Sequence, residues 1–344
     1  MSASRPPATL VVAVAMLSLG GLWAPAAAQE DSPLRGVTAP LPALRSGVDL
    51  VALQVTVEDA GGSPVCDLRT EDFTVFENGV AQVVTTFAAP SSPVDVVLLI
   101  DTSGSMTQRE GIARQFVREL LLRLRPDDRV SLIIFSDAVH VSQPAIQDDR
   151  AVDRALQRAA GSRATPESRG TALHDILEAS LRAAGAGNAA AAGIRREAMI
   201  VVSDGEDTAS IRASPEDLLA AARASSITAF TIVPRQIDAT GFLRIVRQAQ
   251  RAEAESTMVS LARETGGRAF IDVANEALAS TSRVIVEELK CQYWLGYEPV
   301  PGARGYRNVV VALPGRARFR ARTRSGYEET APDGQGLWPR RPSP

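Results

Sequence analysis

The sequence is poor in the residues on which much enzyme chemistry depends. Its 344 residues include one lysine, two histidines and two cysteines. The lysine, Lys290, does not follow a Gly-rich loop, so a phosphate-binding loop of the GxxxxGK type is absent. A lysine Schiff base is disfavoured for the same reason. Two cysteines and two histidines are also too few for a Cys/His zinc cluster.

A strong charge of either sign is absent as well. The 37 basic and 40 acidic residues leave a net charge of −3, so we expect no nucleic acid as a partner. Aromatic residues make up only 5%, but hydrophobic residues reach 45% and charged ones 22%. This composition is typical of a folded globular protein, and the length fits one large domain with a smaller one.

Long hydrophobic runs are missing beyond the N-terminus. There, Arg5 precedes an apolar run from Ala8 to Trp23, and small residues follow up to Ala28. This pattern predicts a signal peptide over residues 1–28, cleaved after Ala28. A membrane anchor is the alternative, but a spanning helix needs about 20 apolar residues. We therefore expect an exported protein, periplasmic or extracellular, with no transmembrane segment in the mature chain.

The remaining residues divide into five regions. Alternating apolar residues from Val51 to Val57 predict a strand, and Asn78-Gly79 predicts a tight hairpin turn. Isolated two- or three-stranded pieces are marginal, so we expect an N-terminal and a C-terminal β segment to form one small all-β, sandwich-like domain with another domain inserted into it. The predicted regions are a linker (29–45), the N-terminal β segment (46–90), the inserted domain (92–290), the C-terminal β segment (291–328) and a disordered tail (329–344).

The inserted region alternates strands with helices. The apolar run Val94 to Ile100 predicts a central strand buried on both faces. The alternation predicts an α/β fold with a doubly wound, mainly parallel sheet. The other expected strands are 129–135, 139–141 at an edge, 198–202, 227–233 and 268–271, and the expected helices are 108–124, 150–159, 172–184, 215–224 and 276–289.

A group of oxygen-bearing side chains follows the strands of this predicted sheet. Asp101, Ser103 and Ser105 alternate in the loop after the first buried strand, and Asp204 follows a later strand. Thr171 lies just before a predicted helix. Ligands of open α/β sheets bind at the carboxyl ends of strands, where these loops lie. Carboxylate and hydroxyl oxygens suit Mg²⁺, Mn²⁺ or Ca²⁺. The alternative is that the DTSGS segment only caps a helix.

These five residues, in this order, resemble the metal-ion-dependent adhesion site of the von Willebrand factor type A (VWA) domain. The resemblance covers about residues 92–290, and the flanking phrases Glu71-Asp72-Phe73 and Tyr293-Trp294-Leu295-Gly296-Tyr297 resemble an exported bacterial group of related proteins. It implies a divalent ion, Mg²⁺ or else Mn²⁺ or Ca²⁺, that accepts a carboxylate from an Asp or Glu of a partner protein. The implied metal ligands are Asp101, Ser103, Ser105, Thr171 and Asp204.

The resulting expectation is a metal-dependent protein-binding or adhesion module rather than an enzyme. One alternative is an assembly or scaffold subunit of the cell envelope. Another is a hydrolase in which His174 acts with Ser103 or Ser105 and Asp204. The sequence has no G-x-S-x-G elbow, so we expect His174 to be an exposed helix residue.

Two further features carry expectations. Arginines at positions 316, 318, 320, 322 and 324 alternate with smaller or apolar residues, which predicts one strand with five guanidinium groups on a single face, in a hairpin with residues 308–313. That face is either a polyanion-docking strip or, as we favour, an ordinary solvated surface. Cys66 and Cys291 lie in the two β segments, so an oxidising compartment favours a disulfide between them, with two buried thiols as the alternative.

Overall fold

A computed structural model describes residues 50–143, 149–162, 170–185, 195–235, 243–300 and 305–329. All of them lie in the compact unit Gly47–Pro344. The predicted signal peptide (1–28), linker (29–45) and most of the predicted tail (329–344) fall outside the described residues. Among the described residues, none of the helices has the length and apolar character needed to cross a bilayer.

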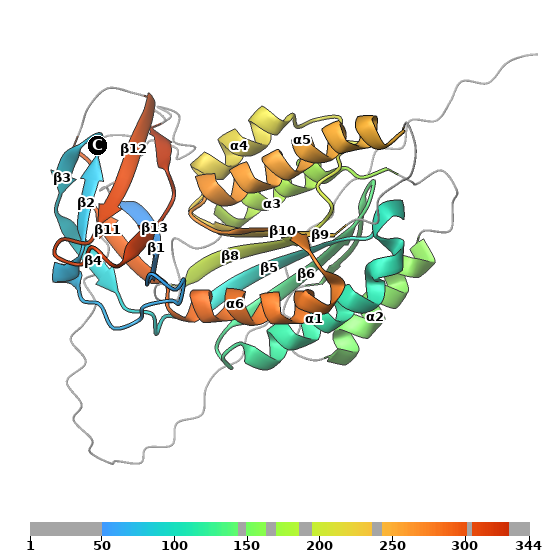
Figure 1. Ribbon diagram of the computed structural model, residues 1–344, viewed down its shortest axis with the longest axis horizontal. Helices are drawn as coiled ribbons and strands as arrows, with labels where there is room; N and C mark the ends of the chain where they lie inside the picture. Colours follow the sequence, from blue (N-terminus) through green and yellow to red (C-terminus); the bar gives the residue numbers. More distant parts are fainter. Residues whose placement is uncertain are drawn as a thin grey trace, which may run out of the picture. The chain divides into compact units, whose positions relative to one another are not determined.

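A six-stranded sheet forms the centre of the larger domain (Figure 1). Its strand order is β10-β9-β8-β5-β6-β7, and every neighbouring pair is parallel except β6 with β7, the antiparallel edge. The doubly wound α/β prediction is confirmed. The strands are β5 (Val94–Asp101), β6 (Arg129–Phe135), β7 (Val139–Gln143), β8 (Arg196–Val202), β9 (Thr228–Pro234) and β10 (Ala269–Val273).

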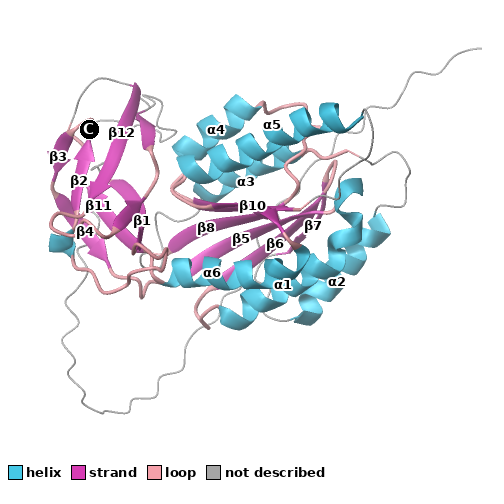
Figure 2. Cartoon of the chain, viewed as in Figure 1, coloured by secondary structure: helices cyan, strands magenta, loops and turns pink. Residues whose placement is uncertain are grey.

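Helices cover both faces of this sheet (Figure 2). Helices α1, α2 and α6 pack on one face around buried residues such as Phe116 and Ile285, and α3, α4 and α5 pack on the other around Leu177 and Met258. The helices are α1 (Glu110–Arg123), α2 (Asp149–Ser162), α3 (Leu173–Gly185), α4 (Pro215–Ala224), α5 (Leu243–Glu264) and α6 (Leu278–Lys290), with short 3₁₀ turns η2 (Gly104–Arg109) and η3 (Asn275–Ala277).

Local sequence explains where these elements begin and why they are buried. Leu98, Leu99 and Ile100 of β5 are each 0% exposed, because helices cover the strand from both sides. Ser214 caps α4 by accepting a hydrogen bond from the N–H of Asp217, and Pro215 occupies the first helical position.

The strand order creates a topological switch point beside β5. The chain leaves β5 through α1 toward β6 on one side, whereas it leaves β8, the other neighbour of β5, toward β9. The loops that follow β5 and β8 therefore diverge at the carboxyl edge. In open α/β sheets such divergence leaves a crevice in which ligands bind.

The two ends of the chain form a second lobe of two antiparallel four-stranded sheets, ordered β13-β1-β11-β4 and β14-β12-β2-β3. Both sheets mix N- and C-terminal strands around one core that includes Leu53, Val75, Tyr293 and Val311. The elements are β1 (Val51–Glu58), η1 (Thr70–Asp72), β2 (Thr74–Glu77), β3 (Val80–Gln82), β4 (Val84–Ala88), β11 (Tyr293–Tyr297), β12 (Gly305–Ala312), β13 (Arg320–Arg322) and β14 (Gly326–Glu329).

Polar contacts join this β lobe to the amino edge of the large sheet. The side-chain nitrogen of Gln54 donates to the carbonyl of Glu197, at the start of β8, at 3.0 Å and to that of Ser226, just before β9, at 2.7 Å. Gln292 donates to Thr228 Oγ1, in the first residue of β9, at 3.1 Å. The carboxyl edge of the sheet thus faces away from these contacts.

A charge network and a disulfide complete the junction. Glu288 of α6, 1% exposed, pairs with Arg268 at 2.9 Å and with Arg322, which also lies 3.2 Å from Glu58. Cys66 and Cys291 are bonded, with their Cα atoms 4.7 Å apart. The bond ties the segment after β1 to the C-terminal end of α6.

The predicted long arginine strand is wrong. Only Arg320–Arg322 is a strand, it pairs with β1 rather than β12, and turns precede it. Arg316 pairs with Asp72 at 2.7 Å, and Arg324 donates to the carbonyl of Gly326 at 2.9 Å. Because tertiary partners draw several of these arginines inward, the described residues form no row of five guanidinium groups on one face.

Candidate functional site

The loop after β5 is built around Asp101, which is 2% exposed. Its Oδ1 accepts the backbone N–H of Ser103 at 2.8 Å, and its Oδ2 accepts the hydroxyl of Ser203 at 2.6 Å. The hydroxyls of Ser103 and Ser105 lie 3.2 Å apart. Three oxygen-bearing side chains predicted from the DTSGS segment are therefore brought together at the end of β5.

The loop after β8 brings a second carboxylate to the same edge. Asp204 is 0% exposed, and its Oδ1 accepts the N–H of Glu206 at 3.2 Å. Gly205 adopts φ 83°, and an added Cβ would lie 3.0 Å from the carbonyl oxygen of Ala254, so the tight turn requires glycine. Ser203 fixes this loop to the first, because its hydroxyl also accepts the N–H of Gly205 at 3.0 Å.

The electrostatics show that the two carboxylates interact. Burial, helped by the negative charge of Asp204, raises the pKa of Asp101 to about 6, against hydrogen bonds from Ser203 and Ser103 that lower it. Within the described residues, the hydrogen bonds to Asp101 come from a backbone N–H and hydroxyls, with no ion pair to a basic side chain. Two buried carboxylates placed this way favour a cation beside them.

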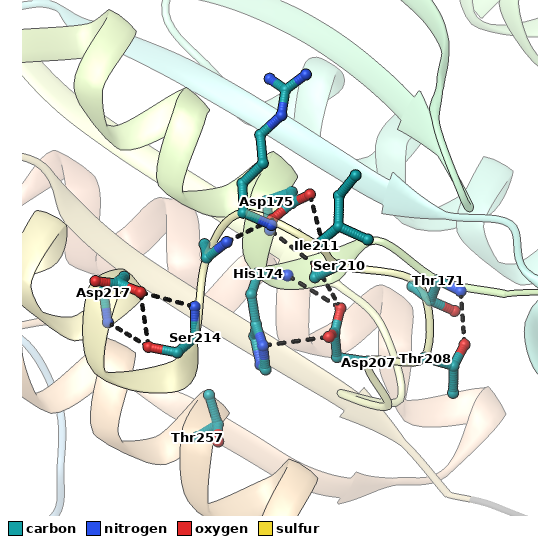
Figure 3. Close-up of polar contacts among 12 residues, drawn as sticks. Thr171, His174, Asp175, Asp207, Thr208, Ser210, Ile211, Ser214, Asp217 and Thr257 are labelled. Atoms are coloured by element: carbon teal, nitrogen blue, oxygen red, sulfur yellow. Dashed lines mark hydrogen bonds and ion pairs between the residues drawn. The ribbon is translucent and has the colours of Figure 1, made fainter.

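Thr171, 3% exposed, lies on a third loop whose backbone is fixed to the second. Its N–H donates to Thr208 Oγ1 at 2.9 Å (Figure 3). Its carbonyl accepts the N–H groups of Thr208 and Ala209, both at 2.9 Å. On the other side, the N–H of Ala172 donates to the carbonyl of Ser136 after β6 at 2.8 Å. All three candidate loops thus lie at the carboxyl edge.

A second polar cluster secures residues 207–213 against the start of α3 (Figure 3). The Asp175 carboxylate accepts the backbone N–H groups of Ile211, Arg212 and Ala213 at 3.1, 2.9 and 2.7 Å. Burial raises the pKa of Asp175, but these three hydrogen bonds outweigh burial and leave it below its usual value. The carboxylate therefore acts as a charged anchor for the loop.

His174 belongs to this cluster, and the prediction that it is an exposed helix residue is wrong. It is 8% exposed, and its Nδ1 lies 3.3 Å from Asp207 Oδ2. Ser210 donates to Asp207 Oδ1 at 2.6 Å and accepts the N–H of Asp175 at 3.0 Å. His174 has no hydrogen bond to Ser103 or Ser105 among the described residues, so the arrangement of a Ser-His-Asp nucleophile is not formed there.

Several residues that hold the site together were not predicted from the sequence. Ser203 directly precedes the candidate ligand Asp204, so its position in the sequence could have indicated that it belongs to the site. The side chains of Thr208 and Asp175 accept backbone N–H groups of residues that are 37 and 36 positions away in the sequence. No local sequence pattern identifies such contacts. Among the described residues, groups of three or more His, Cys, Asp or Glu suited to a metal are absent. The candidate site instead combines two carboxylates with hydroxyls.

Comparison with a family model agrees with this geometry. The model of the von Willebrand factor type A domain matches residues 95–277, more than half of the chain. The chain belongs to the VWA family. The matched residues include both the parallel sheet and the three loops at its carboxyl edge. No curated protein matches this VWA chain closely enough to count as a relative.

Comparison with solved structures gives matches of low sequence identity. A VWA protein of Catenulispora acidiphila is 13% identical with a TM-score of 0.42, over 79% of this chain and 72% of that one. An aerotolerance-related membrane protein of Bacteroides fragilis is 22% identical with a TM-score of 0.38, over 57% and 98%. Proximal thread matrix protein 1 of the mussel byssus is 14% identical with a TM-score of 0.41, over 58% and 48%. This chain thus spans about half the length of the mussel protein.

Proposed function

We propose that this protein is an exported, metal-dependent protein-binding module whose site is held by Asp101, Ser103, Ser105, Thr171 and Asp204. The observation that carries the proposal is the pair of buried, mutually repelling carboxylates at the switch point, next to two hydroxyls 3.2 Å apart. The described residues offer Asp101 no basic partner. A divalent cation would relieve this repulsion.

The chemistry of the donors fits a hard cation. Carboxylate and hydroxyl oxygens suit Mg²⁺, and Mn²⁺ or Ca²⁺ can occupy similar sites. With only Asp101 and Asp204 bringing formal charge, the residues do not overcompensate a divalent ion. The ion would therefore supply Lewis acidity that attracts an Asp or Glu carboxylate of a partner protein. Because the row of five arginines, whose alternative role was to dock a polyanion, is not formed among the described residues, we place recognition at the carboxyl edge.

Metal-dependent thermal stability tests the site. Mg²⁺ or Mn²⁺ should raise the melting temperature of the wild-type protein, because binding to the folded state alone contributes about 2.7 kcal/mol at 100 times the dissociation constant. Asp101→Asn should abolish this increment with little change in volume. Asp153→Asn, which removes a half-exposed carboxylate of α2 that pairs with Arg114, should keep it. An equal metal response in Asp101→Asn and wild type would refute the site.

The role of Thr171 can be tested in the same assay. Thr171→Ala should reduce the metal response while leaving the melting temperature without metal nearly unchanged, since Thr171 holds the neighbouring loops through its backbone groups. Thr257→Ala is a matched control on α5, where the hydroxyl bonds only the carbonyl of Glu253 at 3.2 Å (Figure 3). Equal responses in the two variants would exclude Thr171 as a ligand.

A further inference from the structure

The loop at residues 207–213, which we call the clasp loop, presents an unusual side chain to solvent. Ile211 is 88% exposed, the highest value among the large hydrophobic side chains in the described part of the chain. Single exposed apolar residues are common and need no explanation by themselves. The feature that distinguishes Ile211 is how firmly its backbone is held.

Three consecutive N–H groups, from Ile211 to Ala213, donate to the one carboxylate of Asp175. Asp207 and Ser210 secure the preceding part of the loop against His174 and the start of α3 (Figure 3). Fixing the backbone of an exposed apolar residue costs conformational entropy and buries no apolar surface in the fold. A preordered loop does, however, lower the cost of binding a partner.

The clasp loop also lies next to the proposed metal site. The N–H of Ala209 donates to the carbonyl of Thr171. Ile211 is two residues further along, and because successive Cα atoms are 3.8 Å apart its Cα lies within about 7.6 Å of that of Ala209. Ile211 therefore stands at the rim of the same carboxyl edge. A protein side chain that reaches this edge brings its neighbours within range of the loop.

Arg212 adds a charge to this rim. Its side chain is exposed and makes no ion pair with the residues that the structure describes. Arg212 and the divalent cation of the proposed site would both attract carboxylates, whereas the neighbouring Ile211 favours an apolar contact. Such a surface complements a peptide segment that carries acidic residues beside an aliphatic or aromatic one.

We propose that the clasp loop determines specificity: Ile211 contacts an apolar side chain of the partner segment whose carboxylate reaches the metal, and Arg212 pairs with a second acidic group of that segment. This inference rests on the proposed metal-dependent function. It adds the chemistry of the partner, an exposed protein segment with two acidic residues and an apolar one. The partner class is a protein rather than an anionic polymer, because a polymer of charged groups offers nothing to Ile211.

The test uses a phage-displayed library of cyclic random peptides, selected on the full-length protein in Mg²⁺ and eluted with EDTA. The expected peptides combine acidic residues with an aliphatic or aromatic residue. A synthetic peptide of the selected sequence should bind Ile211→Ser about tenfold more weakly than wild type. Arg212→Glu should weaken the same peptide by a similar factor, and more so at low salt.

Leu122→Ser is the matched control. Leu122 is 70% exposed near the far end of α1, a helix of 14 residues and thus about 21 Å long. This variant should bind the peptide as wild type does, and all three variants should keep the rise in melting temperature with Mg²⁺.

Each outcome has one meaning. EDTA-eluted peptides that bind Ile211→Ser and Arg212→Glu as tightly as wild type would overturn the role of the clasp loop and leave the metal-dependent function standing. Selection that yields only peptides insensitive to EDTA would overturn the proposed function and this inference with it.

Discussion

Removing the disulfide should destabilise the β lobe more than the VWA domain. Cys66 and Cys291 are 225 positions apart, so their bond closes a very long loop in the unfolded chain. For a loop of this length the chain-entropy model gives about 5 kcal/mol at 25 °C. Cys66 is exposed and Cys291 is half-buried, so Cys66→Ala with Cys291→Ala removes little packing. The loss of free energy of unfolding should therefore report the cross-link itself, at about 2 to 5 kcal/mol.

The location of the effect follows from the separate cores. The β lobe is built around one cluster of buried residues, whereas two others hold the helices on the parallel sheet. The bond joins the segment after β1 to the end of α6, directly before β11. Its removal leaves the N-terminal β1 and the C-terminal β11 joined by their antiparallel pairing and side-chain packing, without a covalent link. Native-state hydrogen exchange should show lost protection in β1 and β11 well before β5 and β8.

Two measurements check this prediction. Urea unfolding of wild type and the double variant gives the difference in free energy, and exchange followed by mass spectrometry gives its location. Alkylation of denatured, unreduced wild-type protein should find no free thiol. Two alkylated thiols would show that the bond does not form. Equal urea midpoints, or equal loss of protection in β5 and β11, would refute the reasoning about the cross-link.

Three further predictions concern Glu77, Phe116 and Asp175. Burial raises the pKa of Glu77, but hydrogen bonds from Tyr297, Arg307 and Tyr327 outweigh burial and leave this pKa below its usual 4.5. The ionised carboxylate therefore stabilises the fold above about pH 4.5, and this stabilisation is lost as the pH falls through the lower pKa of the folded protein. Acid unfolding of Glu77→Gln should depend less on pH in that window than acid unfolding of the wild type. Phe116→Ala should reduce the free energy of unfolding by about 3 to 5 kcal/mol, because Phe116 is 0% exposed in the core beneath α1, and a urea midpoint equal to that of wild type would contradict this. Asp175→Asn should increase hydrogen exchange at Ile211, Arg212 and Ala213 without lowering protection in β8, and unchanged exchange at these amides would show that the carboxylate does not hold the loop.

The parallel sheet was predictable because its signals are local. The continuous apolar run in β5 identifies a strand covered on both faces, and the helix expected over 215–224 is α4 with the same bounds. The site followed from the same reasoning. Strand ends in a parallel sheet share one edge, so residues after β5 and β8 had to lie near each other once the strands were assigned.

The errors arose where partners far apart in sequence decide the outcome. Alternating arginines have the period of a strand, but Pro314-Gly315 begins a turn, and Arg316 finds Asp72 across 244 positions. The sequence around His174 predicts an exposed helix residue, but in the fold His174 contacts Asp207, which lies 33 positions later in the chain. The local sequence around Arg316 and His174 contains neither Asp72 nor Asp207. A charged or polar side chain is therefore the element whose environment is hardest to infer from sequence alone.

The insertion of the VWA domain into the β lobe also explains why one edge of the sheet is available for binding. The parallel strands all begin at the amino edge of the sheet and end at the opposite edge. Gln54 and Gln292 of the β lobe contact the starts of β8 and β9, and Arg268 just before β10 joins the charge network around Glu288. With β5 eight residues long, the proposed metal site lies about 26 Å from the junction, at 3.3 Å per residue. The contacts that join the lobes therefore use none of the site's side chains. A partner can occupy the carboxyl edge without separating the lobes, so the stability of the junction and the affinity of the site are free to vary independently.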